Sequence, residues 1–268
     1  MIELNKIGEL YYLAHKLANN CPDKYVSWFA VGCYYYCVKK FDLARKYFTK
    51  SNQLNKHFPE GWIALGNCYA AQDESDQALS AYRTCLRLFP GCHYANLYIG
   101  MEFVRTNNLK TALVAFQDAL NISNNDPLVY NEIGVVFYKQ RMYEEAEFHF
   151  LKGLELCKED KSNVYQTLTI NLANCYRKLK WVIYIHIHIH IINFRKYDDA
   201  IILYNKVIKM DNRSVSVLSA LAYTLHLKGD YMQALDIYHK ANFIKSDDTF
   251  VVEMINRCLN DMIELSEN

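Results

Sequence analysis

A regular sequence period constrains the fold of this chain more than any other feature. Four alanines recur at steps of 34, and each is preceded by a glycine at a constant offset of 12. The positions are Ala44, Ala78, Ala112 and Ala146 for the alanines, and Gly32, Gly66, Gly100 and Gly134 for the glycines. Apolar residues around both sets follow the 3.6-residue period of a helix. Each period therefore predicts two helices, A and B, which approach closely where glycine and alanine carry little bulk.

The residues between these positions match one known type of helical repeat. The second period reads Trp62, Leu65, Gly66, Tyr69, Ala78, Tyr82 and Pro90, a pattern typical of tetratricopeptide repeats (TPRs). TPR units stack so that each one packs only on its neighbours, and the resulting solenoids bind other proteins. We therefore predict an all-α fold, a right-handed TPR superhelix (α-solenoid) of about six helix-turn-helix repeats.

The same period divides the chain into segments. These are helix B of an incomplete preceding repeat over 1–24, repeats over 25–58, 59–92, 93–126, 127–165, 166–214 and 215–248, and a capping helix over 249–268. Leu10 and Ala14 fall on helix B positions with no helix A before them, which favours a longer solenoid whose start is truncated or wrongly assigned. At the other end, Val252, Ile255 and Leu259 predict the apolar face of the capping helix.

The spacing breaks twice. The step from Gly134 to Ala173 is 39, an excess of five, which we place in helix B of the fourth repeat or in the turn that follows, over 156–164. The step from Ala173 to Ala200 is then 27 where the other repeats have 12, an excess of 15. The sixth repeat returns to register, because the step from Ala200 to Ala234 is again 34. The second excess therefore falls inside the turn between helices A and B.

The extra residues form a low-complexity segment over 181–195, in which isoleucine and histidine alternate as in a β-strand. One interpretation is a metal site, because His186, His188 and His190 would share one face of a strand. We favour a translated intron over Val182–Lys196, because valine codons begin with GT and the lysine codon AAG ends with AG. Removing this segment restores the spacing of 12. A genuine insertion that forms a surface hairpin is the alternative, and consistent retention of these codons in cDNA from mature message would exclude the intron.

Composition excludes several classes of function. Lys and Arg total 30 against 29 for Asp and Glu, so no strong field attracts a phosphate backbone or an anionic lipid surface. Nucleic acid and membranes are therefore not expected partners, and no segment reaches the ~20 apolar residues of a bilayer span. The nine cysteines lack zinc-ligand spacing and are typical of small buried hydrophobes in a reducing compartment. Because no phosphate loop, nucleophile elbow or Cys/His constellation is recognisable, we expect no catalytic residue, metal or cofactor.

Binding is expected in the concave groove, which one face of each helix A lines in a TPR superhelix. By repeat, this face is Phe29, Cys33 and Tyr36; Ile63 and Asn67; Leu97, Met101 and Arg105; Asn131, Val135, Tyr138 and Lys139; Ile170, Asn174, Arg177 and Lys178; and Ser219, Tyr223 and His226. The amides of Asn67 and Asn174 suit the backbone of an extended or helical peptide, unless they simply face solvent. Lys139, Arg177 and Lys178 form a partial basic set that suits an acidic segment, with a solvated face as the alternative. Phe29 and Cys33 stand where the Lys, Asn, Asn, Lys, Arg clamp of chaperone-binding TPR domains would begin, which disfavours a receptor for chaperone tails.

Several runs of residues resemble a particular family of TPR proteins. The runs are 10–17 (LYYLAHKL), 26–35 (VSWFAVGCYY), 91–93 (GCH), 97–100 (LYIG), 106–108 (TNN), 175–180 (CYRKLK) and 247–250 (DDTF). They resemble the sixth-subunit family of the anaphase-promoting complex (cyclosome), also called the cell-division-cycle sixteen family. Runs such as Gly-Cys-His lie outside the TPR consensus positions, which makes the resemblance more specific. It covers nearly the whole chain except 181–195.

The resemblance implies a non-catalytic scaffold subunit of a multisubunit ubiquitin ligase that controls mitotic exit, located in the nucleus and cytoplasm. In that family the superhelix homodimerises through its N-terminal part, stacks on related TPR subunits and encloses the N-terminal segment of a small companion subunit. This chain resembles the C-terminal part, so the companion groove is expected without the dimer interface. Two alternatives stay open: a free-standing TPR adaptor or co-chaperone, and the targeting region of a TPR-containing enzyme.

Overall fold

A computed structural model describes residues 7–157, 162–186 and 193–267 of the chain. In these residues it contains fourteen α-helices and no strand. No helix within the described ranges is long and apolar enough to cross a membrane. The chain divides into two compact units, Met1–Val129 and Tyr130–Asn268, which are described separately.

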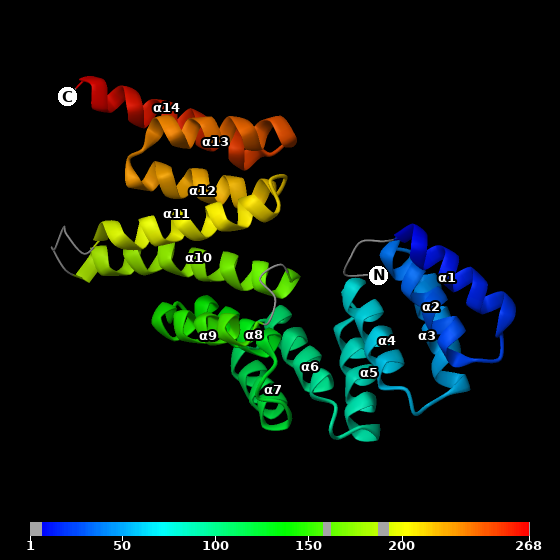
Figure 1. Cartoon of the computed structure of the whole chain (residues 1–268). Helices are drawn as coiled ribbons and strands as arrows, with labels where there is room; N and C mark the ends of the chain where they lie inside the picture. The colour runs from blue at the N-terminus through cyan, green and yellow to red at the C-terminus, as the bar shows by residue number, and fades with distance from the viewer. Residues whose placement is uncertain (1–6, 158–161, 187–192, 268) are drawn as a thin grey trace. The chain divides into compact units, whose positions relative to one another are not determined.

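Each unit is built from consecutive helices that pair as hairpins (Figure 1). The helices of the first unit are α1 (Ile7–Asn20), α2 (Tyr25–Cys37), α3 (Phe41–Leu54), α4 (Pro59–Ala71), α5 (Ser75–Leu88), α6 (His93–Arg105) and α7 (Leu109–Ile122). Helix α8 (Pro127–Lys139) begins at the unit boundary, and α9 (Tyr143–Leu156), α10 (Asn163–His186), α11 (Asn193–Met210), α12 (Val215–Lys228), α13 (Tyr231–Ile244) and α14 (Thr249–Glu267) follow. From α2 to α13, even numbers are helices A and odd numbers are helices B. The predicted all-α repeat fold is confirmed.

The glycines of helix A allow an aromatic ring of helix B to approach the backbone. A Cβ atom added at Gly100 would lie 2.3 Å from the ring of Phe116, and one at Gly66 would lie 2.3 Å from the ring of Tyr82. Both rings are almost completely buried. Such distances are far inside van der Waals contact, so only glycine fits while the rings stay in place. The predicted close approach of helices A and B is therefore confirmed at these positions.

The turn from helix A to helix B repeats a backbone conformation that the residue pattern did not reveal. Lys39, Asp73, Asn107 and Arg141, which recur at the repeat period, all have positive φ, and Gly229 has a φ of 96° in the sixth repeat. In the second repeat the N–H groups of Asp73 and Glu74 donate to carbonyl oxygens of the preceding helix end. This is the Schellman motif, which satisfies the last carbonyls of a helix and turns the chain sharply.

The excess of five residues before Ala173 lies outside helix B of the fourth repeat. Helix α9 keeps the 14 residues of α7, so the alternative of a longer helix B is wrong. Six residues, 157–162, separate α9 from α10, where four residues, 123–126, separate α7 from α8. The remaining three residues extend the start of α10, which begins ten residues before Ala173, whereas α8 begins seven before Gly134.

The described ends of the segment over 181–195 continue the two helices that flank it. Residues 181–186 belong to α10 and residues 193–195 to α11, so the strand expected from the alternating pattern is wrong for these residues. His188 and His190 lie outside the described residues, so the metal hypothesis stays a prediction. Helices α10 and α11 are thus helices A and B of the fifth repeat, each lengthened by residues of this segment.

Deleting Val182–Lys196 is expected to produce an ordinary repeat turn. Lys180 lies seven residues after Ala173, as Arg141 lies seven after Gly134, and so takes the turn position with positive φ. Tyr197 then begins helix B, as Tyr143 begins α9. We expect the deletion variant to melt at the same temperature as the parent chain or higher, measured by circular dichroism. A control deletion of 182–194 leaves two extra residues in the turn, and this variant should melt at a lower temperature than the full deletion. If the full deletion melted at a lower temperature than the parent chain, the expectation would be contradicted.

The last helix packs through a different face from the one predicted. Val251, Met254 and Cys258 of α14 are buried; of the predicted residues, Ile255 is half-buried against the same core, whereas Val252 and Leu259 are exposed. The predicted face is therefore wrong by about one residue, or roughly 100° around the helix axis. The error has a simple cause: both sets recur at spacings of three and four residues, and only the packing of α14 on α13 decides between them.

Candidate peptide-binding groove

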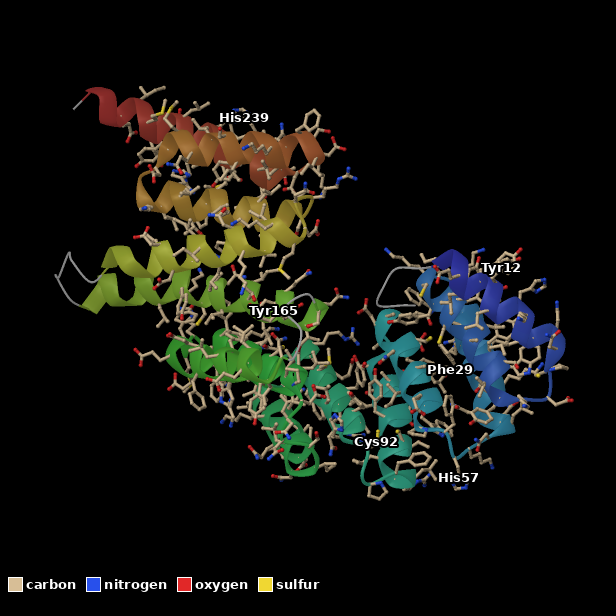
Figure 2. All side chains as sticks on the ribbon, in the orientation of Figure 1. Tyr12, Phe29, His57, Cys92, Tyr165 and His239 are labelled. Atoms are coloured by element: carbon tan, nitrogen blue, oxygen red, sulfur yellow. The ribbon has the colours of Figure 1, made fainter. Side chains whose placement is uncertain are left out.

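Three of the predicted groove residues in the first unit lie in the interior. Cys33, Ile63 and Leu97 are buried, and burial raises the pKa of the Cys33 thiol to about 12. They therefore have no surface to offer a ligand, because this helix face turns toward the next repeat. Phe29 is half-buried, with its ring centre 4.9 Å from that of Phe58 (Figure 2). Tyr36 and Met101 are also half-buried and keep some surface for a ligand.

Two of the three predicted groove asparagines bind tyrosines of their own repeat. The hydroxyl of Tyr82 donates to Oδ1 of Asn67 at 2.7 Å, and that of Tyr204 donates to Oδ1 of Asn174 at 2.8 Å. In the repeats whose helix B carries phenylalanine in place of this tyrosine, the helix A residue that follows the glycine is apolar. These pairs are Cys33 with Phe48, Met101 with Phe116 and Val135 with Phe150. The asparagine thus satisfies a buried hydroxyl, which neither the peptide interpretation nor the solvent interpretation anticipated.

Removing a tyrosine hydroxyl is expected to cost stability where the hydroxyl has a hydrogen-bond partner and to cost none where it has no partner. Tyr82→Phe should lower the free energy of unfolding by about 1 kcal/mol, and Asn67→Ala by about 2 kcal/mol, because the latter leaves a buried hydroxyl without an acceptor. Tyr238→Phe is the matched control, since the Tyr238 hydroxyl is buried without a partner among the described residues. It should leave stability unchanged or raise it in urea unfolding. Equal losses in the free energy of unfolding for Tyr82→Phe and Tyr238→Phe would contradict this role of the asparagine.

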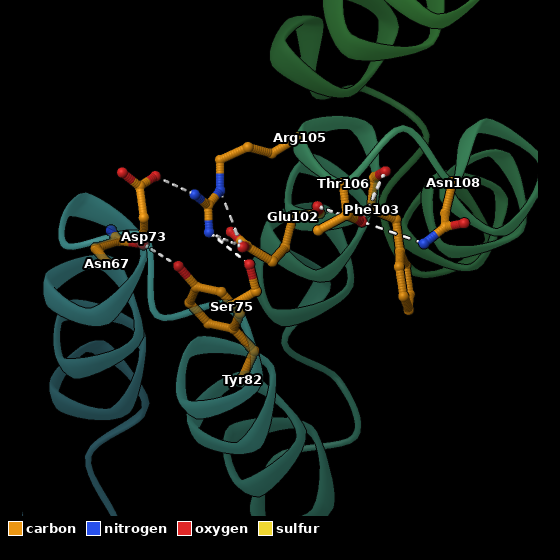
Figure 3. A network of polar contacts seen from close by, with 9 residues as sticks. All are labelled: Asn67, Asp73, Ser75, Tyr82, Glu102, Phe103, Arg105, Thr106 and Asn108. Atoms are coloured by element: carbon orange, nitrogen blue, oxygen red, sulfur yellow. Dashed lines mark hydrogen bonds and ion pairs between the residues drawn. The ribbon is translucent and has the colours of Figure 1, made fainter.

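Arg105 of α6 binds Glu102 of its own helix, Ser75 at the start of α5 and Asp73 in the turn before α5 (Figure 3). Its guanidinium pairs with the carboxylates of Glu102 and Asp73 and donates to the Ser75 hydroxyl at 2.7 Å. Glu102 is only 4% exposed, and the Arg105 guanidinium is the cation that pairs with its carboxylate. The hydrogen bond to Glu102 also raises the pKa of Arg105. Arg105 therefore fastens α6 to the turn before α5, and most of its donors are already engaged.

In the second unit, three more predicted residues are buried and bonded within the chain. Asn131 accepts a hydrogen bond from Asn171 at 2.8 Å, and Ser219 donates to a backbone carbonyl at 2.8 Å. His226 Nε2 lies 2.7 Å from an Asp261 carboxylate oxygen, which joins α12 to α14. These contacts stabilise the repeats, and they leave Arg177 and its neighbours as the accessible part of the predicted groove.

The structure brings Arg177, Ser219 and Tyr223 together in one pocket. The pocket has a volume of about 510 Å³, and its remaining lining residues are Ser216, Ala220, Asp248 and Phe250. The Arg177 guanidinium lies 5.3 Å from the centre of the Tyr223 ring, and its Nε is buried without a partner among the described residues. A buried donor of this kind is costly unless an acceptor reaches it.

Helix geometry and the repeat spacing could have predicted three of the four lining residues that the sequence analysis missed. Ser216 and Ala220 lie one helical turn from Ser219 and Tyr223 on α12. Phe250 follows Ser216 by one repeat period, and the starts of α12 and α14 are separated by the same period. The helix called a cap therefore occupies the place of a helix A, and the same spacing applied beyond 248 would have found Phe250.

Positive charge gathers beside this pocket. The pKa of Lys178 is lowered by burial and by the neighbouring Arg177 and Arg141 guanidinium groups. Arg141 thus extends the predicted basic set, in which Lys139 is exposed. Tyr138 is half-buried; burial raises its pKa and the nearby Arg177 opposes that rise. Val135 and Ile170 are half-buried as well. The surface suits a peptide that carries an acidic or carbonyl group beside an apolar side chain.

A larger pocket of the first unit is a weaker candidate. It has a volume of about 760 Å³, lies outside the predicted groove and is lined by Trp28 and residues of α3, with Tyr69 of α4. Its Arg45 is already paired with Asp42 at 3.2 Å and with Glu74 at 3.5 Å. Lys50 lies over the Trp28 ring, 3.3 Å from its centre. Its main cations therefore have partners within the chain.

Comparison with known proteins places this architecture in a family. Tetratricopeptide repeat models match residues 59–92 and 203–236. Anaphase-promoting complex subunit 6 of Arabidopsis thaliana is 44% identical over 97% of this chain and 45% of its own length. The cell division cycle protein 16 homolog of Homo sapiens is 39% identical over 100% of this chain and 42% of its own length. The chain thus spans less than half the length of these curated relatives.

A solved structure gives the same result in three dimensions. The crystal structure of the APC/C hetero-tetramer Cut9-Hcn1 contains a chain that superimposes with a TM-score of 0.81. The two sequences are 32% identical, and the match covers 96% of this chain and 47% of the other. The sequence matches and the structural match therefore each cover almost all of this chain.

Proposed function

Because the chain belongs to the family of anaphase-promoting complex subunit 6, or cell division cycle protein 16, we propose that it forms part of a non-catalytic TPR scaffold in that multisubunit ubiquitin ligase. The observation that carries the proposal is 44% identity over 97% of the chain. Within each unit the stacked helical hairpins supply the framework that a scaffold needs. In this role the chain assembles proteins in the nucleus and cytoplasm and performs no bond chemistry of its own.

The pocket around Arg177 is the proposed contact for a small companion subunit. The neighbouring structure holds Cut9 together with Hcn1, and this supports a companion of that kind here. The Arg177 guanidinium would donate to a carbonyl or carboxylate of the companion, while Tyr223 and Phe250 would cover an apolar side chain. Other TPR subunits of the same complex are the proposed partners of the remaining surface.

Affinity purification of the tagged chain, followed by mass spectrometry, tests the proposal. The expected result is co-purification of other subunits of the anaphase-promoting complex together with a small companion. Recovery of chaperones without any of these subunits would replace the proposal by a free-standing TPR adaptor. Recovery of neither group would contradict a scaffold role. An otherwise intact Arg177→Ala chain should lose the companion and retain the TPR subunits.

A further inference from the structure

The larger pocket of the first unit, called here the α3 pocket, follows one face of α3. Its volume is about 760 Å³, and α3 packs on both α2 and α4, which contribute Trp28 and Tyr69 to the lining (Figure 1). The lining residues from α3 are Asp42, Arg45, Lys46, Tyr47, Thr49, Lys50 and Gln53. Spacings of three and four residues place most of them on one stripe of the helix, with Lys46 and Lys50 about one turn apart. The pocket is therefore elongated along α3.

Stacked aromatic rings hold the wall of the α3 pocket in place. The Tyr47 ring stacks on those of Trp28 and Tyr35, with ring centres 5.8 and 5.4 Å away and planes within 7° of parallel. The Trp28 indole N–H donates to the Pro22 carbonyl at 2.7 Å, which fixes the outer ring of the stack. The Lys50 ammonium lies over that ring, 3.3 Å from its centre. The stack thus positions a cation at the edge of the pocket before any partner arrives.

The pocket keeps positive charge to offer a partner. Arg45 is paired with Asp42 and Glu74. Within the described part of the chain, no acidic group pairs with Lys46, and the Trp28 ring attracts the Lys50 ammonium without cancelling its charge. The surrounding sequence has the same sign: residues 1–58 contain nine lysines and arginines against four aspartates and glutamates, whereas the whole chain has 30 against 29. This field favours an anionic partner.

We propose that the α3 pocket binds an acidic peptide segment of a partner protein, whose carboxylates pair with Lys46 and Lys50. The rise between these two residues is about 6 Å along the helix axis. Alternate residues of an extended peptide are about 6.6 Å apart, so acidic residues at alternate positions match the two ammonium groups. The Thr49 hydroxyl and the Gln53 amide add neutral donors on the same stripe. The inference is independent of the Arg177 pocket, because the two pockets belong to different units.

A single-stranded nucleic acid is the other anionic partner that a basic, aromatic pocket can hold. Such strands bind through bases that stack on open aromatic faces. Here Lys50 and Tyr47 lie against the Trp28 ring, and the Arg45 guanidinium lies over the Tyr69 ring, 5.3 Å from its centre. Side chains of the chain itself thus occupy the ring faces that bases would need. A carboxylate needs only the cations, and this favours the acidic peptide.

Fluorescence polarisation with labelled hexaglutamate tests the charge of the pocket in the full chain at about 0.15 M salt. The chain should bind the probe, and Lys46→Glu combined with Lys50→Glu should weaken Kd at least about 10-fold, because two attractive pairs become repulsive. The matched control is Lys16→Glu combined with Lys110→Glu, which changes the net charge equally at exposed lysines outside the pocket. Its Kd should stay within about 2-fold of the parent value. Absence of binding, or equal losses in the two double variants, would overturn the proposal.

Tryptophan emission locates the bound peptide. Trp28 lines the pocket, so the emission of the chain should change as hexaglutamate saturates it. The change should disappear in Trp28→Phe while polarisation still shows binding, because phenylalanine keeps a ring beneath Lys50. An emission change that persists in Trp28→Phe would place the peptide elsewhere and refute the site. Hexathymidylate that binds more tightly than hexaglutamate would assign the pocket to nucleic acid and refute the peptide. Circular dichroism checks that every variant keeps its helices.

Discussion

Replacing Arg105 with alanine is expected to lower the free energy of unfolding by about 3 kcal/mol. The reason is Glu102, which is 4% exposed and whose carboxylate pairs with the Arg105 guanidinium. Without that partner a buried charge must stay unpaired, take up a proton or move to solvent, and each outcome costs stability. The turn residue Asp73 also loses its contact with α6. Urea unfolding of the full chain, followed by circular dichroism, measures the loss.

Two control variants isolate the buried charge. Arg105→Lys keeps a positive charge but lacks the forked donors, so about half of the loss is expected. Arg105→Ala combined with Glu102→Leu removes both charges and should recover most of the stability. A loss below about 1 kcal/mol for Arg105→Ala, or a double variant less stable than the single one, would show that the pair is not coupled in this way.

Replacing Gly100 with alanine is expected to lower the free energy of unfolding by about 2 kcal/mol, although alanine is the better helix former by ~1 kcal/mol. The added methyl group would lie 2.3 Å from the Phe116 ring, which is completely buried and has no room to move away freely. The later repeats carry Ala173 and Ala222 at this position beside Tyr204 and Tyr238, so a shifted ring can accept the methyl group. That limits the expected loss to a few kcal/mol.

Gly8 provides the matched control. It lies in α1, and a Cβ added there would meet nothing within 4 Å. Gly8→Ala should therefore raise the melting temperature slightly through helix propensity alone. Calorimetry of both variants separates the steric effect from propensity. If Gly100→Ala were as stable as Gly8→Ala, the close approach of helices A and B would not be a constraint.

The repeat fold could be predicted because its decisive contact is local and periodic. Gly66 and Tyr82 belong to the two adjacent helices of one repeat, and the same pair recurs as Gly100 and Phe116. A contact between residues so close in the chain repeats whenever the sequence repeats. The turn of the second repeat was not predicted, because Asp73 and its equivalents share a positive φ without sharing a residue type. There the conformation follows from helix ending and hydrogen bonding, not from the side chain.

The groove was harder to predict than the fold because adjacent faces of a helix differ by small rotations. Leu97 was expected on the inner wall and is completely buried. Asn67 was expected to face a peptide or solvent and accepts a hydrogen bond from Tyr82. In the second unit, Arg177, Ser219 and Tyr223 were expected on one surface and do line one pocket. The role of these residues in binding stays a prediction.

If the companion binds at the Arg177 pocket, its affinity for the chain must depend on the Arg177 guanidinium. The probe is a fluorescent peptide of the N-terminal segment of the companion recovered with the tagged chain. Loss of a charged hydrogen bond costs about 1.5–3 kcal/mol, so Arg177→Ala should weaken Kd by roughly 10- to 100-fold. Arg45→Ala, in the other pocket, should leave Kd unchanged. An unchanged Kd in a folded Arg177→Ala chain would contradict the account.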